Sequence, residues 1–230
     1  MSPSKLYARA QKVDSLGHAS LLPSNNSLAD ALQYALENSA ANGLPSITIS
    51  PLQGQYLAIQ SQLISAKNIL EIGTLGGYST IWFASTGAKV TSLEIDPQHR
   101  DVALQNVKHA GLEDSVDVIL GPALDTLPTL AKDGKKFDLV FIDADWGEQF
   151  DYFAHAVKLV RPNGCIYVDN VVREVLEGDA QAYESGKKET LFQKVGKLDG
   201  VQATLVSVVS SHKRHEDEAF DGFLLAVVKG

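Results

Sequence analysis

The sequence has little sulfur and no long apolar run. Cys165 is the only cysteine among 230 residues, which excludes an intramolecular disulfide and a zinc site built from several cysteines. It stands in the apolar run CIYV, so we expect a small core residue rather than a nucleophile. The longest apolar stretches, residues 139–142 and 224–228, are far shorter than the ~20 residues that a membrane helix needs, and we expect no membrane partner.

The sequence also lacks an excess of positive charge. Its formal net charge is −8, and its lysines and arginines are scattered rather than gathered in a stripe, so we expect no nucleic-acid partner. The N-terminal residues MSPSKLYARAQK contain no apolar signal core, and a cytoplasmic location is the corresponding expectation. Hydrophobic residues at 44% and charged residues at 21% are close to the soluble globular average, which excludes a disordered or fibrous protein.

What is present is an alternation of strand-like and helix-like segments, typical of an α/β domain. From about residue 67 onward, short β-branched runs alternate with helical stretches. The expected strands are residues 68–72, 89–95, 116–120, 137–143 and 165–170, and the expected helices are residues 78–85, 98–110, 124–130 and 150–159. This order implies right-handed crossovers and a doubly wound, mostly parallel sheet.

The two ends of the chain complete this expected domain. Residues 201–209 and 222–229 are expected to pair as a hairpin-like unit, which gives a seven-stranded sheet with an antiparallel edge strand. Helical patterns at the other end predict an N-terminal helical lid, residues 1–66, on a core of residues 67–230. These patterns cover residues 27–42 and 51–66. Because no linker is visible and the length fits one well-buried domain, residues 1–230 are predicted to form a single domain.

A glycine-rich turn, EIGTLGGYS at residues 71–79, follows a predicted strand and opens a helix, where α/β sheets place ligands. Its spacing differs from the G-x-G-x-x-G dinucleotide fingerprint, and the Glu71 carboxylate would repel a pyrophosphate but attract a sulfonium with a free amino group. Glu94 ends the next strand, close to the ~20-residue offset at which an acidic side chain reaches a ribose diol. The turn therefore predicts a site for a cationic adenosyl amino acid, with a purely structural turn as the alternative.

Polar side chains end the two following strands. Asp143 and Asp145 end the predicted strand 137–143, and Asp169 and Asn170 end the next one. Adjacent parallel strands open into the same crevice, where these groups would repel one another unless a cation compensates them. Carboxylate and amide oxygens suit Mg²⁺, with Mn²⁺, Ca²⁺ or Zn²⁺ as alternatives. The other interpretation is that Asp143 and Asp169 only cap a helix and a turn.

Five motifs, LEIGTLGGYST, SLEIDP, LGPALDTLP, FDLVFIDAD and VDNVVR, together resemble the cation-dependent class I S-adenosylmethionine (SAM) O-methyltransferases, which include catechol and caffeoyl-CoA O-methyltransferases. The resemblance spans residues 50–229. It implies a Rossmann-like methyltransferase fold, a SAM-binding core and transfer of a methyl group to a hydroxyl of a small catechol-like or phenolic substrate. It also implies a possible homodimer.

The resemblance assigns roles residue by residue. The cofactor-binding positions that it implies are Ile49, Glu71, Gly73, Thr74, Ser79, Glu94, Ile95, Gly121, Ala123 and Asp145. The implied metal ligands, which are also the catalytic residues, are Asp143, Asp169 and Asn170. The expected substrate-binding residues are Trp146, Arg173 and Glu174.

One position departs from the family pattern. Trp146 stands where these families commonly carry a lysine proposed as the base, and an indole cannot accept a proton. Either metal acidification of the phenol suffices, or His215 or Lys213 reaches the site. Three other interpretations stay open: a metal-independent methyltransferase, a SAM-binding protein that has lost catalysis and, least supported, a dehydrogenase.

Overall fold

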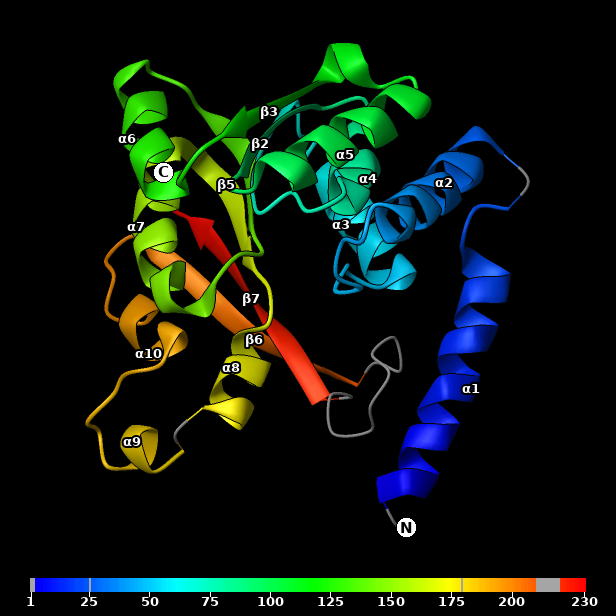
Figure 1. The fold of residues 1–230 in the computed structure, drawn as a ribbon. Coiled ribbons are helices and arrows are strands. Elements are labelled where there is room, and N and C mark those ends of the chain that lie inside the picture. Colours follow the sequence, from blue (N-terminus) through cyan, green and yellow to red (C-terminus); the bar gives the residue numbers. More distant parts are fainter. Residues whose placement is uncertain (1–2, 25, 179, 210–219) are drawn as a thin grey trace.

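The computed structural model describes residues 3–24, 26–178, 180–209 and 220–230 and confirms the doubly wound α/β prediction (Figure 1). Seven strands form one sheet in the order β3-β2-β1-β4-β5-β7-β6. Their bounds are β1 Asn68–Ile72, β2 Lys89–Glu94, β3 Val116–Leu120, β4 Phe137–Ile142, β5 Val160–Val168, β6 Val201–Val209 and β7 Phe220–Val228. Strands β1 to β5 are parallel, whereas β7 runs antiparallel to both of its neighbours.

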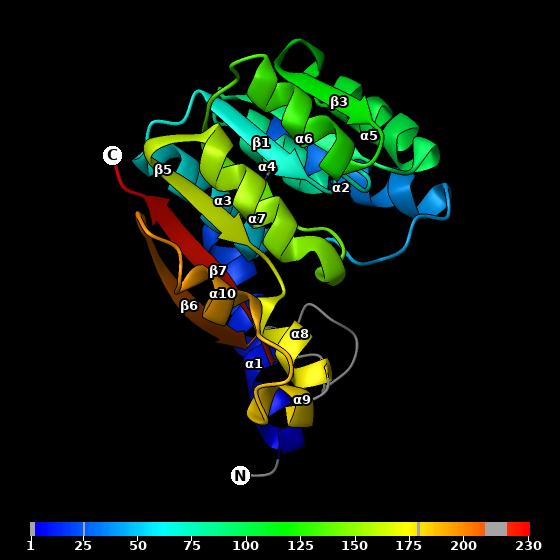
Figure 2. The same ribbon diagram turned by 90° about the vertical axis from the view of Figure 1, so that its left-hand side faces the viewer.

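Helices cover both faces of the sheet. The helices are α1 Pro3–Leu21, α2 Ser27–Ala41, α3 Pro51–Leu63, α4 Tyr78–Ala84, α5 Pro97–His109, α6 Ala123–Lys132, α7 Gln149–Leu159, α8 Val171–Glu177, α9 Ala180–Glu184 and α10 Leu191–Val195, with short 3-10 turns η1 Glu113–Ser115 and η2 Trp146–Glu148. Figure 2 shows α6 and α7 in front of the strands and α3 and α4 behind them. Each face has its own apolar core, one around Leu57, Phe83 and Phe141 and one around Leu127 and Phe153.

Strand β7 rather than β6 lies next to β5, and the side chains explain the order. Residues in the middle of β7 are buried, whereas every side chain of β6 is exposed or half-buried, as an edge strand can tolerate. Ile166 of β5 pairs with Ala226 of β7, and Val201 of β6 pairs with Val228. The predicted hairpin-like pair is therefore confirmed. Because β7 is antiparallel, its beginning lies at the carboxyl ends of the parallel strands.

The helical patterns within the predicted lid do not cover α1, and no pattern predicts the short helices after β5. In α1 the large apolar side chains of Val13 and Leu16 are 67% and 68% exposed, so this helix lacks the buried stripe that periodicity detects. Helices α8, α9 and α10 have 7, 5 and 5 residues, too few to show a helical period. None of the helices within the described ranges is long and apolar enough to cross a membrane.

Candidate functional site

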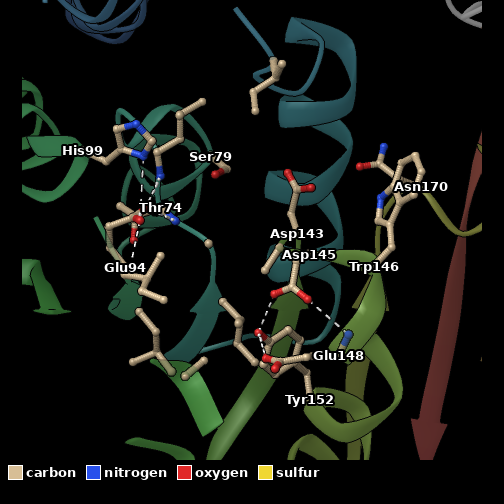
Figure 3. Close-up of a pocket in the computed structure, with 18 of the residues that line it drawn as sticks. Thr74, Ser79, Glu94, His99, Asp143, Asp145, Trp146, Glu148, Tyr152 and Asn170 are labelled. Atoms are coloured by element: carbon tan, nitrogen blue, oxygen red, sulfur yellow. Dashed lines mark hydrogen bonds and ion pairs between the residues drawn. The ribbon is translucent and has the colours of Figure 1, made fainter. Parts of the chain in front are cut away.

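A cavity of about 600 Å³ opens at the carboxyl ends of β1, β2 and β4, where the sequence places its glycine-rich turn. Figure 3 shows Glu94 on one side of this cavity, Trp146 and Asn170 on the other, and Asp143 between them. The predicted site residues that line it are Ile49, Gly73, Thr74, Ser79, Glu94, Ile95, Gly121, Ala123, Asp143, Asp145, Trp146, Asn170 and Arg173. Segments far apart in the sequence thus converge on one space, which we call the first cavity.

Three predicted site residues do not line the first cavity. Glu71 is fully buried beneath it. Glu174 turns toward α9, where its Oε1 accepts a hydrogen bond from the Tyr183 hydroxyl at 3.2 Å and lies 3.8 Å from Lys188 Nζ. Asp169 lines a neighbouring second cavity instead. His215 and Lys213, the two candidates for a base, lie outside the described residues.

The glycine-rich turn is shaped by close approach of two strand ends. Gly73 has φ +96°, and a Cβ there would lie 2.0 Å from the backbone oxygen of Asp143, so no side chain fits. The amide of Gly73 donates to the Leu93 oxygen, and the amide of Asp143 donates to the Ile72 oxygen, at 3.0 and 2.9 Å. These bonds tie the ends of β1, β2 and β4 together, which fixes the floor of the first cavity.

Glu71 is the centre of a buried hydroxyl network under the turn. Its carboxylate accepts hydrogen bonds from Ser79 Oγ and Thr80 Oγ1 at 2.5 Å and from Ser92 Oγ at 2.6 Å. Burial raises the pKa of Glu71 to about 7, against the lowering effect of the three hydroxyl donors. Glu71 therefore links β1 to β2 and to the start of α4, and these hydrogen bonds stabilise the turn above it.

Glu94 is held by the backbone of the turn that it faces. Its Oε2 accepts from the amides of Thr74 and Leu75 at 3.1 and 2.7 Å. Its Oε1 accepts from the amides of Ile95 and Asp96, both at 2.9 Å. The carboxylate is only 6% exposed but still lines the first cavity, so a ligand would meet a fixed acceptor there.

Asp145 anchors the segment after β4. Its Oδ1 caps η2 by accepting from the Glu148 amide at 3.2 Å, and its Oδ2 accepts from the Tyr152 hydroxyl at 2.8 Å (Figure 3). The same hydroxyl is 2.7 Å from Glu148 Oε2. Burial and the two neighbouring carboxylates raise the pKa of Tyr152, so this phenol remains a donor that orients Asp145.

Trp146 and Arg173 form a stacked pair at the wall of the first cavity. The Arg173 guanidinium lies over the Trp146 ring, 5.7 Å from its centroid, within cation–π range. Arg173 Nε donates to Glu177 Oε1 at 2.8 Å, which keeps the guanidinium in place. The pair gives this wall a flat aromatic face backed by a positive charge.

The side chains of Asp143, Asp169, Asn170 and Asp221 lie at one edge of the sheet, where β4 and β5 end and β7 begins. Burial raises the pKa of Asp169 well above its usual range, and the nearby charges of Asp143 and Asp221 add to the shift. Asp169 Oδ1 accepts from Gln53 Nε2 at 2.8 Å, and Asn170 Nδ2 donates to Asp221 Oδ2 at 2.9 Å. The sequence interpretation did not include Asp221. In the sequence, Asp221 is an acidic residue at the start of the last apolar run. This position indicates a place in the site only once β7 is known to run antiparallel to β5.

The oxygen atoms of the side chains at this edge are of the kinds that bind a hard cation. Asp143, Asp169 and Asn170 supply two carboxylates and one amide oxygen, the ligand types that Mg²⁺ and Ca²⁺ prefer. A cation there would compensate the charges of Asp143 and Asp221, which raise the pKa of Asp169. Within the described ranges no three His, Cys, Asp or Glu side chains are grouped to hold a metal, so the amide is needed to complete the set.

Known proteins of similar sequence are named as O-methyltransferases. Residues 24–211 match the model of a family described as O-methyltransferase. A catechol O-methyltransferase of Mycobacterium tuberculosis is 43% identical over 204 residues, which cover 86% of this chain and 89% of that protein.

Two solved structures with a bound nucleoside ligand resemble this protein along nearly its whole chain. The O-methyltransferase of Bacillus cereus in complex with SAH is 38% identical, with a TM-score of 0.82 over 97% of this chain and 100% of that chain. The O-methyltransferase TomG of Streptomyces achromogenes, involved in tomaymycin synthesis and solved in complex with SAM, is 32% identical, with a TM-score of 0.83 over 97% of this chain and 99% of that chain.

Proposed function

The chain belongs to the family of SAM-dependent O-methyltransferases, and from this premise we propose that it methylates a hydroxyl of a small catechol-like phenol with the help of a divalent cation. The observation that carries the proposal is the position of Asp143 and Asn170, which line the same cavity as the glycine-rich turn. A methyl donor on the turn and a hydroxyl held near these two side chains would share one space, as a direct displacement requires.

The first cavity supports SAM binding through different kinds of contact along its length. Glu94 is suited to the ribose hydroxyls because its carboxylate is fixed and faces the cavity. Asp145 is suited to the amino group of the methionine portion, while Ile49 closes that end. The remaining cofactor contacts that we propose are Gly73, Thr74, Ser79, Ile95, Gly121 and Ala123. Glu71 acts indirectly, because its hydroxyl network holds the turn and Ser79.

Asp143, Asp169 and Asn170 would hold the cation, with Mg²⁺ the first choice and Mn²⁺, Ca²⁺ or Zn²⁺ as alternatives. When bound, such an ion acidifies a phenol and orients its oxygen. Asn170 has φ +58° at the N-terminus of α8, which turns its amide toward Asp221. With Nδ2 donating to Asp221, the amide oxygen remains as the ligand atom.

The acceptor ring is proposed to lie against Trp146 and Arg173. Trp146 has no atom that accepts a proton, so its contribution is apolar contact and exclusion of water. Glu174, which hydrogen-bonds with Tyr183 on α9, would act on the substrate only through the position of α8. The homodimer and the cytoplasmic location stay predictions.

A metal-independent methyltransferase is the second candidate. It is favoured by the hydrogen bond that Gln53 Nε2 donates to Asp169 Oδ1, because this bond stabilises a buried candidate ligand without a cation. It differs from the first candidate in its acceptors and in its response to a chelator.

A methyl-transfer screen separates the two candidates. Catechols, caffeoyl esters, flavonoids, monophenols and amines are each incubated with SAM and the protein, once with Mg²⁺ and once with EDTA. We expect O-methylation of vicinal diols with Mg²⁺ and its loss with EDTA. Equal methylation under both conditions, or a preference for monophenols or amines, would contradict the proposal and support the second candidate.

A further inference from the structure

A second cavity of about 560 Å³ lies between α1, the beginning of α3 and the β6–β7 pair. Its volume is within the range of small-molecule sites. Its described lining residues are Asp14, Ser15, His18, Ile47, Ile49, Ser50, Leu52, Gln53, Tyr56, Asp169, Asn170, Val206, Val208, Val209, Asp221 and Phe223. Ile47, Ile49 and Asn170 also line the first cavity, so the two spaces meet beside the candidate metal ligands.

The inner wall of the second cavity is aromatic and rigid. Phe223 of β7 stacks on Tyr167 with ring centroids 4.3 Å apart, and Tyr56 of α3 lies 5.4 Å from Phe223. Gln53 Nε2 donates to both the Tyr167 hydroxyl and Asp169, at 3.1 and 2.8 Å. A flat apolar group placed here would pack against fixed rings rather than against side chains that must first be ordered.

Helix α1 provides the outer wall. A Cβ on Gly17 would lie 3.1 Å from Leu52, so glycine lets α1 approach α3 closely. Gln55 Nε2 of α3 also donates to the Leu21 oxygen at the end of α1, at 2.9 Å. This contact brings the polar side chains of Asp14 and His18 to the cavity (Figures 1 and 2 show α1 extending past the beginning of β7).

The structure assigns the second cavity to the acceptor: we propose that it binds an uncharged aryl group attached to the ring that is methylated. This inference rests on the proposed function, since the cavity would hold the remainder of the same substrate. The first cavity is accounted for by the cofactor and the reacting ring, and the second begins at Asn170, beside the position of that ring. Besides Asp169, which the proposed function assigns to the cation, the acidic side chains of Asp14 and Asp221 line it, so an anionic group on the second ring is disfavoured.

Val208→Phe tests the cavity, and Leu205→Phe is the matched control. Val208 points into the second cavity from β6, whereas Leu205, on the opposite face of the same strand, is 39% exposed and does not line it. Binding of catechol, phenylcatechol and carboxyphenylcatechol to the SAH-loaded protein is measured by calorimetry with Mg²⁺ present. Initial methylation rates are measured on the same compounds.

Wild-type protein should bind phenylcatechol about tenfold or more tightly than catechol, and carboxyphenylcatechol less tightly than phenylcatechol. Val208→Phe should remove most of the preference for the second ring and leave the affinities for catechol and SAH within about twofold, because only the second cavity is filled. Leu205→Phe should behave as wild type. The proposal is overturned if wild type shows no preference for the second ring, or if Val208→Phe weakens catechol and phenylcatechol equally. If calorimetry shows the expected pattern and no compound is methylated, the proposed function fails while the cavity assignment stands.

Discussion

Asn170 Nδ2 donates a hydrogen bond to Asp221 Oδ2 at 2.9 Å, and this bond sets the direction of the Asn170 amide. Asp221 is fixed in turn, because its Oδ1 accepts from the backbone amides of Arg173 and Gly222 at 3.3 and 2.7 Å. An amide whose nitrogen is directed to Asp221 turns its oxygen away from β7. Asp221 is therefore a positioning residue for a candidate ligand atom that lies on another strand end.

Removing this bond should impair turnover without impairing cofactor binding. In Asp221→Ala the Asn170 amide loses its partner and can rotate, and we expect turnover on catechol or Mg²⁺ affinity to fall by about 10- to 100-fold. Asp221→Asn keeps an acceptor oxygen and should lose much less. Initial rates over a range of Mg²⁺ concentrations, with SAH affinity as the control, measure both. Equal losses in the two variants would assign the effect to the charge of Asp221 instead.

Glu71 should make stability depend on pH in a defined window. Its carboxyl has a pKa of about 7 in the fold against 4.5 as the ordinary value, so the unfolded chain releases the proton first as the pH rises. The stability associated with the protonated form is fully present below pH 4.5 and is lost as the pH rises toward 7, by an amount on the order of 3 kcal/mol.

Glu71→Gln removes this titration. Urea unfolding of both proteins between pH 4.5 and 7 should show the wild type losing stability relative to the variant as the pH rises, even if the variant is weaker at the acid end because an amide nitrogen cannot accept from the hydroxyls. Glu113→Gln, at an exposed position in η1, is the control for removing a carboxylate. A stability difference between wild type and Glu71→Gln that stays constant across this window would refute the assignment.

Glu94→Gln should weaken SAH binding by at least about tenfold, since a charged acceptor for two ribose hydroxyls is replaced by a neutral group. The amide nitrogen would also face backbone donors such as the amides of Thr74 and Leu75. Calorimetry gives the affinity, and the melting temperature without ligand separates a binding defect from a folding defect. A folded variant with wild-type SAH affinity would show that Glu94 does not hold the ribose.

Several of these features could be predicted from the sequence, and the others depend on contacts between distant segments. The strands, the glycine-rich turn and the acids after β4 and β5 are local patterns, and the structure confirms the strands and brings those residues to one edge. The position of Glu71 depends on register: it pairs with Ser92 across β1 and β2, and its side chain meets hydroxyls rather than the cavity. Asp221 could not be recognised because its place depends on β7 lying antiparallel beside β5.

Trp146→Lys introduces the amine that related families commonly carry at this position. It also removes the ring on which Arg173 stacks, so we expect substrate KM to rise by about tenfold and kcat to change less. Rates on catechol from acid to alkaline pH measure both. In the wild type, the log rate should rise with a slope near one until the phenol is fully ionised, because Trp146 has no titrating group. A large gain in kcat at unchanged KM in the variant would show that a missing base limits the enzyme.

The most direct test of the account is the initial rate of catechol methylation at saturating SAM, measured for EDTA-treated protein as Mg²⁺ is added back. Asp143, Asp169 and Asn170 form the candidate ligand set, so the rate should be lost with EDTA and restored by Mg²⁺ in a saturable manner. In Asp169→Ala it should stay low at every Mg²⁺ concentration, with SAH affinity preserved. A catechol rate that is the same with EDTA and with Mg²⁺ would contradict cation-assisted transfer at this site.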